Sequence, residues 1–141
     1  MIILDTNVLS ALMRKLPDAA VVGWLDRQPA ESIWITSVTL FEARLGLALL
    51  PDGERRAALA SAFARLLEEV RIASWNFDTG AAIEGTELAA RWQRAGRPVD
   101  SHDTQISGIA LARHATLATR NARHFADLKI NVIDPWQASG R

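Results

Sequence analysis

The chain has 141 residues, of which 49% are hydrophobic and 23% charged. This composition excludes extensive disorder and suits one domain, spanning residues 1–141, with a sizeable core. The 16 basic and 16 acidic residues cancel, so the overall charge does not indicate a nucleic-acid binder. Because the chain has no cysteine, any metal must be held by oxygen or histidine.

The apolar residues at the start of the chain are relevant to the expected subcellular location of the protein. No basic stretch precedes them, and Asp5 interrupts them too early for a secretory signal or a membrane span. We therefore expect a cytoplasmic protein.

The predicted elements alternate between short strands and helices. Apolar and β-branched runs predict strands over residues 1–4, 33–36, 71–75, 115–119 and 131–134. Helical spacing predicts helices over residues 8–13, 17–27, 37–50, 54–70, 79–95, 101–114 and 121–128. Thr6 or Asn7 is available to cap the first helix. Strands separated by helices imply an α/β fold, a three-layer α/β/α sandwich around a mostly parallel sheet of four to five strands.

Two acids stand where packing alone does not explain them. Asp5 follows the first strand, and ligands of open α/β sheets bind in the crevice outside the carboxyl ends of the strands. Glu42 falls on or beside an apolar stripe of the 37–50 helix that is expected to face the core. A carboxylate there is costly to bury unless it is paired, and Arg44 is one possible partner. The stripe consists of Val38, Phe41, Leu45, Ala48 and Leu49.

A third acid, Asp103, lies in the first turn of the 101–114 helix, on the same face as Ile106 and Ala110. An acid in a first turn also stabilises its helix through the macrodipole, so a purely structural role is open. Asp100 is a second candidate for the same functional position, or else the N-cap of this helix.

Considered together, Asp5, Glu42 and Asp103 belong to three βα connections that converge on one edge of a parallel sheet. Clustered carboxylates repel one another unless a cation offsets their charge. Mg²⁺ or Mn²⁺, which take oxygen ligands, are the natural cations. Asn121 would supply a fourth oxygen from a fourth connection, although it could equally cap a helix.

These residues resemble four motifs of the PIN domain family, the nuclease-like fold of VapC toxins from type II toxin–antitoxin modules. The resemblance spans nearly the whole chain and is nearest to the subgroup that includes the FitB protein. The matching stretches are Ile3 to Val8, Thr39 to Gly46, Gly96 to Val99 with Asp103 and Ile106, Leu117 to Asn121 with His124 and Phe125, and the ending Val132 to Trp136. The chain departs from the family pattern at Asn121, where an acid is usual, and this would weaken the hold on a metal.

The resemblance implies a ribonuclease toxin dependent on Mg²⁺ or Mn²⁺, which cleaves RNA and is neutralised by a small DNA-binding antitoxin of the VapB type. It also implies a homodimer, and it implies that the antitoxin wraps helices near residues 8–28 and 38–70. Asp5, Glu42 and Asp103 would be both catalytic residues and metal ligands, with Asn121 as a further ligand. From the residues themselves, Thr6 and Thr119 are candidates for orienting ligands or water, with helix capping as the alternative for Thr6, and Arg120 is a candidate for contacting a phosphate, with a surface ion pair as the alternative.

Two other readings remain open. A FitB-like protein could act mainly as the partner of a DNA-binding antitoxin, in transcriptional autoregulation, with a weak or idle nuclease site. A haloacid-dehalogenase-type phosphatase also begins with an apolar strand and an Asp, but Asn7 stands where its second acid would be.

The histidines and tryptophans are not expected to take part in the site. His102, His114 and His124 share no metal-ligand spacing and are expected to be structural or solvent-facing. The five Trp residues are expected mostly in the core or in interfaces.

Overall fold

The computed structural model describes residues 1–72 and 75–138. Within these ranges five strands form one sheet in the order β3-β2-β1-β4-β5, and every neighbouring pair is parallel. The strands are β1 (Ile2–Leu4), β2 (Ile33–Ile35), β3 (Arg71–Ile72), β4 (Thr116–Ala118) and β5 (Val132–Ile133). The α-helices are α1 (Thr6–Met13), α2 (Ala19–Asp26), α3 (Ser37–Ala48), α4 (Glu54–Glu69), α5 (Thr79–Arg94) and α6 (Ser101–Arg113), and two 3₁₀ turns are η1 (Ala30–Ser32) and η2 (Ala122–Phe125).

The first strand of the chain is the central strand of the sheet. β1 pairs with β2 on one side and with β4 on the other, so the strand order reverses there, at the kind of switch point where α/β proteins bind ligands. The backbone N–H of Asp5 continues the β1–β4 pairing with a 2.9 Å hydrogen bond to the carbonyl of Ala118. Asp5 is thereby fixed at the carboxyl edge of the sheet.

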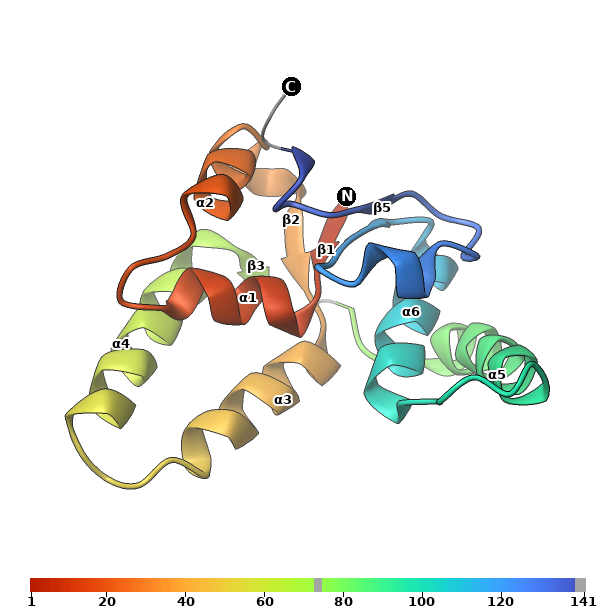
Figure 1. Ribbon diagram of the computed structural model, residues 1–141, viewed down its shortest axis with the longest axis horizontal. Coiled ribbons are helices and arrows are strands. Elements are labelled where there is room, and N and C mark those ends of the chain that lie inside the picture. Colours follow the sequence, from red (N-terminus) through yellow and green to blue (C-terminus); the bar gives the residue numbers. More distant parts are fainter. Residues whose placement is uncertain (73–74, 139–141) are drawn as a thin grey trace.

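Helices cover both faces of the sheet (Figure 1). Successive strand residues point to opposite faces, so Leu4 packs into a core shared with α1, α2 and α4, whereas Ile3 packs into a core shared with α5 and α6. This arrangement confirms the expected three-layer α/β/α sandwich. Trp24, Trp75 and Trp92 are buried, as expected for most of the tryptophans.

α5 and α6 pack against each other unusually closely, through two glycines. A Cβ added at Gly108 would overlap the carbonyl oxygen of Ala81 and would lie 3.0 Å from the backbone nitrogen of Gly85. The absence of side chains at Gly85 and Gly108 therefore sets how near the two backbones come.

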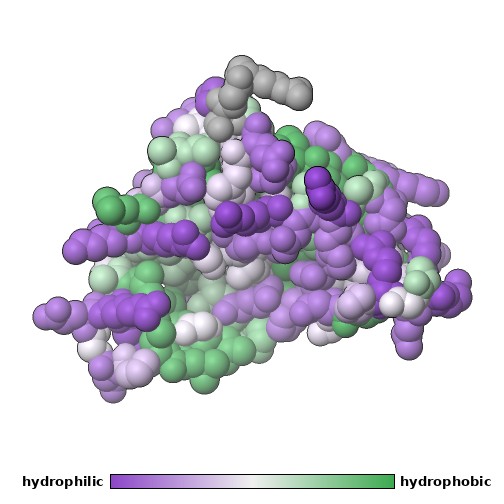
Figure 2. Space-filling view, viewed as in Figure 1, coloured by the Kyte–Doolittle hydropathy of each residue, from purple (hydrophilic) through white to green (hydrophobic). Residues whose placement is uncertain are grey.

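The predicted apolar stripe of the third helix does not face the core as expected. Phe41, Leu45 and Leu49 are 57%, 43% and 75% exposed, and the buried residues of α3 are Val38 and Thr39, near its beginning. α3 therefore buries its first turn most completely, and Leu40, Ala43 and Leu47 are partly buried against the core. The face that carries Phe41, Leu45 and Leu49 is left exposed. A hydrophobic band over α3 is visible on the surface (Figure 2).

Several boundaries differ from the predictions in informative ways. The cap of α1 is Asp5, whose side chain accepts from the Thr6 N–H, and not Thr6 or Asn7. The predicted helix over residues 121–128 is the shorter 3₁₀ turn η2. The predicted strand over 71–75 is confirmed at Arg71–Ile72, while residues 73 and 74 lie outside the described part of the chain. No helix in the described part is both long and apolar enough to cross a membrane.

Candidate functional site

Asp5 performs two tasks at the end of β1. One carboxylate oxygen, Oδ1, accepts the Thr6 N–H at 2.8 Å and caps α1, while Oδ2 accepts the Thr119 hydroxyl at 2.8 Å. The residue is only 6% exposed. Burial raises the pKa of Asp5, and the carboxylates of Glu42 and Asp100 raise it further, against the opposing effect of the Thr119 and Thr6 hydrogen bonds. A buried carboxylate in this setting would be stabilised by a nearby cation.

Asn7 completes the connection between the ends of β1 and β4. Its side-chain amide donates to Oδ2 of Asp5 and to Oγ1 of Thr119, both at 3.3 Å, and its Oδ1 accepts the Arg120 N–H at 3.2 Å. Sequence reasoning assigned Asn7 no role at the site. The available signal was its place two residues after Asp5, on the first turn of a helix that starts at the site.

Glu42 is joined to the same edge by Thr6. The Thr6 hydroxyl donates to Oε1 of Glu42 at 2.8 Å, and Nδ1 of His102 lies 3.2 Å from Oε2. Arg44, the alternative partner predicted for Glu42, instead lies over the ring of Phe63. The hydroxyls of Thr6 and Thr119 are therefore each bonded to a site carboxylate, where they position acids directly.

Asp103 reaches the site from the first turn of α6. The helix is capped by Asp100, whose Oδ1 accepts the N–H groups of His102 and Asp103, so the capping role predicted for Asp100 is confirmed. The Asp103 side chain is one-third exposed. Burial raises its pKa to about 6, with further contributions from Asp5, Asp100 and Glu42 and a smaller opposing one from His102. The charges of Asp5 and Glu42 therefore act on Asp103, which shows that the three predicted acids lie near one another.

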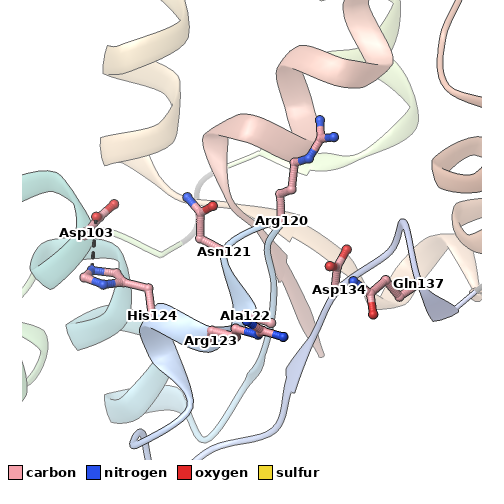
Figure 3. A pocket seen from close by; sticks show the side chains of 8 residues that line it. All are labelled: Asp103, Arg120, Asn121, Ala122, Arg123, His124, Asp134 and Gln137. Carbon is pink, nitrogen blue, oxygen red and sulfur yellow. Dashed lines mark ion pairs between the residues drawn. The ribbon is translucent and has the colours of Figure 1, made fainter.

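A cleft of about 630 Å³ opens beside Asp103 (Figure 3). Asn121 lines it, with its amide directed toward Asp103, and its backbone N–H donates to Oγ1 of Thr119 at 3.2 Å. The Asn121 side chain does not cap η2, which removes the structural alternative. Arg120 also lines the cleft, with its guanidinium over the ring of Trp136, 4.7 Å from the ring centroid.

Two histidines contact the predicted acids, which their spacing in the sequence did not indicate. His102 lies beside Glu42, and Nε2 of His124 lies 3.6 Å from Oδ2 of Asp103. Neither contact could be found from helical or strand periodicity, since each joins segments that only the tertiary fold brings together. His114 is exposed at the end of α6, with φ of 53°, and fits the expected solvent-facing role.

The donor set suits a hard divalent cation, although it is not a closed cage. No three His, Asp or Glu side chains within residues 1–72 and 75–138 lie close enough to hold a metal together as they stand. Mg²⁺, however, usually binds through one or two carboxylates and keeps several waters. Asp5 and Asp103, whose ionisation is opposed by burial and by neighbouring acids, offer oxygen ligands that such an ion would stabilise.

These features define a class: a parallel α/β protein with carboxylates gathered at the carboxyl edge of its sheet. The PIN domain family model matches residues 2–131, and the chain belongs to this family. It is 38% identical over 139 residues to the plasmid stability protein StbB of Pseudomonas syringae pv. tomato, covering 98% of this chain and 100% of StbB. It is 35% identical over 141 residues to the VapC ribonuclease Y4jK of Sinorhizobium fredii, covering 97% of this chain and 99% of the relative.

A solved structure agrees with these matches. The fold is similar to the crystal structure of FitAcB from Neisseria gonorrhoeae, with a TM-score of 0.84 and 31% sequence identity, covering 97% of this chain and 99% of that chain. The expected resemblance to the FitB-type PIN proteins is thereby confirmed.

Proposed function

We propose that the chain is a divalent-metal-dependent ribonuclease toxin of a type II toxin–antitoxin module. The observation that carries this proposal is the convergence of Asp5, Glu42 and Asp103, from three separate segments, on one edge of the sheet. Burial, together with the charges of the neighbouring acids, raises the pKa of Asp5 and Asp103 there. Membership of the PIN family and similarity to a protein named as a VapC ribonuclease support the same activity.

In this proposal Asp5, Glu42 and Asp103 hold Mg²⁺ or Mn²⁺, with Asn121 as a neutral oxygen ligand. When bound there, such an ion would supply Lewis-acid polarisation of the RNA phosphodiester. Thr6 holds Glu42 and Thr119 holds Asp5 through their hydroxyls, so both threonines orient ligands. Arg120, which is exposed beside the cleft, contacts a phosphate of the substrate.

We propose a small antitoxin of the VapB type and a second copy of the chain as protein partners. The exposed apolar side chains of α3 support a partner surface, because soluble proteins rarely leave such side chains together in water without a use. α3 lies within residues 38–70, where the family resemblance implies antitoxin contact. A cleft with an almost wholly apolar lining runs along the same helix, bounded by Leu40, Phe41, Arg44, Leu45 and Ala48 together with Ser37.

The activity is tested by incubating the purified chain, free of antitoxin, with single-stranded RNA in the presence of Mg²⁺, Mn²⁺ or excess EDTA. We expect cleavage with either metal and none with EDTA. Asp5→Asn and Asp103→Asn should abolish cleavage, whereas Asp26→Asn, an exposed acid at the end of α2, should leave it unchanged. Cleavage by Asp5→Asn and Asp103→Asn at the wild-type rate would refute the assignment.

Two observations favour a second function. The acids do not form a closed three-ligand metal group in the described residues, and an amide stands at position 121. The protein would then act mainly as the partner of a DNA-binding antitoxin in transcriptional autoregulation. Promoter DNA binding by the co-purified pair, together with no metal-stimulated RNA cleavage by the free chain, would favour this function over the first.

A further inference from the structure

A cluster of charged and aromatic side chains adjoins His124, whose ring lies beside Asp103. Its centre is Asp127, whose Oδ2 accepts from Nε1 of Trp92 at 3.0 Å and from Arg97 and Arg91 at 3.3 and 3.5 Å. Partial burial opposes ionisation of Asp127, but the hydrogen bonds from Trp92 and Arg97 and the charge of Arg97 outweigh it and lower the pKa of Asp127. Asp127 is thus an anionic anchor that fixes the end of Arg97.

Arg97 in turn holds His124. One guanidinium nitrogen of Arg97 donates to the His124 carbonyl at 2.5 Å and lies 3.4 Å from Nδ1 of the same residue. The guanidinium also stacks over Trp92, 4.4 Å from its ring centroid. The imidazole packs against Trp92 and Phe125, with ring centroids 4.7 and 4.8 Å apart. The ring is therefore held by both packing and hydrogen bonding.

This arrangement selects one tautomer of His124. A guanidinium has only donors, so Nδ1 must present its lone pair to Arg97, and the ring proton of the neutral imidazole then lies on Nε2. Nε2 lies 3.6 Å from Oδ2 of Asp103, slightly beyond hydrogen-bond length. Contacts of this kind are often long in a free enzyme and shorten in the working complex.

From this geometry we propose that His124 is a positioning residue for Asp103, and that Arg97 sets the ring orientation that makes it one. The proposal rests on the function proposed above, in which Asp103 is a metal ligand. A donor behind a carboxylate ligand restricts its rotation and directs its free oxygen toward the metal. The proposal also gives a role to Arg97, which belongs to the Gly96 to Val99 motif. The backbone there is fixed by Gly96, with φ of 74°, and by the Arg97 N–H, which donates to the Trp92 carbonyl at 3.0 Å.

Two substitutions of His124 separate positioning from packing because they keep opposite properties of the side chain. His124→Gln retains a donor near the position of Nε2 and loses the ring, whereas His124→Phe retains the ring and loses the donor. We expect Mn²⁺ affinity, measured by calorimetry on the purified chain, to fall about tenfold in His124→Phe and to stay within about threefold of wild type in His124→Gln. The opposite ranking, or equal affinity in both variants and wild type, would overturn the proposal.

Arg97 and Arg91 provide a matched pair, because both reach Asp127 and only Arg97 reaches His124. Arg97→Met should weaken Mn²⁺ binding as His124→Phe does, and Arg91→Met should not. Urea unfolding of all four variants identifies any loss that comes from an unfolded chain. Equal effects of the two arginine substitutions would show that the cluster acts only on stability and would contradict the proposal.

A metal-free measurement separates this proposal from the proposed function. Long-range ¹H–¹⁵N spectra of the imidazole, recorded where the ring is neutral, should show the Nε2–H tautomer of His124 in wild type and a mixture in Arg97→Met. A wild-type chain that binds no Mn²⁺ would refute the proposed metal site, and the ring spectra would then decide alone whether Arg97 sets the orientation of His124. An Nδ1–H tautomer in wild type would overturn that orientation whatever the metal does.

Discussion

The hydroxyl of Thr119 donates to Oδ2 of Asp5 at 2.8 Å, across a separation of 114 positions in the sequence. The two residues follow β4 and β1, which are neighbours in the sheet, so the bond joins the carboxyl ends of the strands on either side of the switch point. Because Asp5 is buried, this hydroxyl replaces water as a partner of its charge.

Thr119→Val should weaken metal binding because Asp5 loses the hydrogen bond that favours its ionised form. The pKa of Asp5 then rises further, and the proton competes better with a cation. We expect Mn²⁺ affinity to fall about tenfold near neutral pH, and Thr119→Ser to remain close to wild type. Calorimetric titration of both variants measures the effect, which an unchanged affinity in Thr119→Val would contradict.

Substitutions of Asp5 should separate its structural task from its chemical one. Asp5→Ala removes the cap of α1, which costs about 1 kcal/mol, and leaves the buried Thr119 hydroxyl without its partner, which costs a further ~1–3 kcal/mol. Asp5→Asn keeps a capping oxygen and removes a charge that burial disfavours, but it turns an amide nitrogen toward the Thr119 and Asn7 donors, so its stability should lie between those of Asp5→Ala and wild type. Urea unfolding measures both variants, and neither should bind metal.

The stability of the metal-free protein should increase as the pH falls from 7 toward 5. The pKa of Asp103 is raised from its usual 3.8 to about 6 in the fold, so between these values the native state binds more protons than the unfolded chain, and stability falls as pH rises. Asp103→Asn should flatten this dependence. Urea midpoints measured across this pH range test the sign of the dependence. If stability instead increased as the pH rose, and Asp103→Asn abolished that increase, the prediction would be contradicted.

Gly108→Ala should destabilise the protein by about 1–3 kcal/mol or more, because the added methyl group overlaps the Ala81 carbonyl where α5 and α6 meet. Gly46→Ala is the matched control. It lies inside α3 with open space around its Cα, so alanine should stabilise its helix by about 0.5–1 kcal/mol. Thermal unfolding of the two variants should therefore shift in opposite directions.

Leu49→Gln should leave the isolated chain as stable as wild type, since Leu49 is 75% exposed. If α3 is the antitoxin-binding surface, the same change should weaken the complex with the co-expressed antitoxin. Calorimetric titration of antitoxin into wild type and Leu49→Gln compares the two affinities. Ile83→Gln, at an exposed apolar residue of α5 that lies outside both regions expected to contact the antitoxin, is the control.

Local patterns predicted most of the elements, because strands and helices reflect periodicity and capping within a few residues. The error at α3 arises from the same rule: the spacing of Phe41, Leu45 and Leu49 indicates an apolar face, but it does not reveal whether the rest of the chain covers that face. The order of the strands could not be predicted from the sequence either, because the pairing of β1 with β4 depends on contacts between segments far apart in the chain.

The acids were accessible from the sequence because Asp5 and Asp103 stand at the end of a strand and in the first turn of a helix, and Glu42 stands on or beside an apolar stripe, where packing gives no reason for a carboxylate. Their supporting residues were not. The contact of His124 with Asp103 joins η2 to α6, and that of His102 with Glu42 joins α6 to α3. Such contacts depend on tertiary structure that a spacing pattern does not contain.

The central place of β1 has a consequence for how the protein is made. One neighbour of β1, the strand β2, leaves the ribosome soon after it, but the other, β4, begins only at Thr116. During synthesis from the N-terminus, Asp5 therefore has neither Thr119 nor Asn121 beside it until β4 and the residues after it have been translated. A nascent chain that stops short of these residues lacks the edge on which the acids meet, so the site forms only after more than a hundred residues that follow Asp5 have been made.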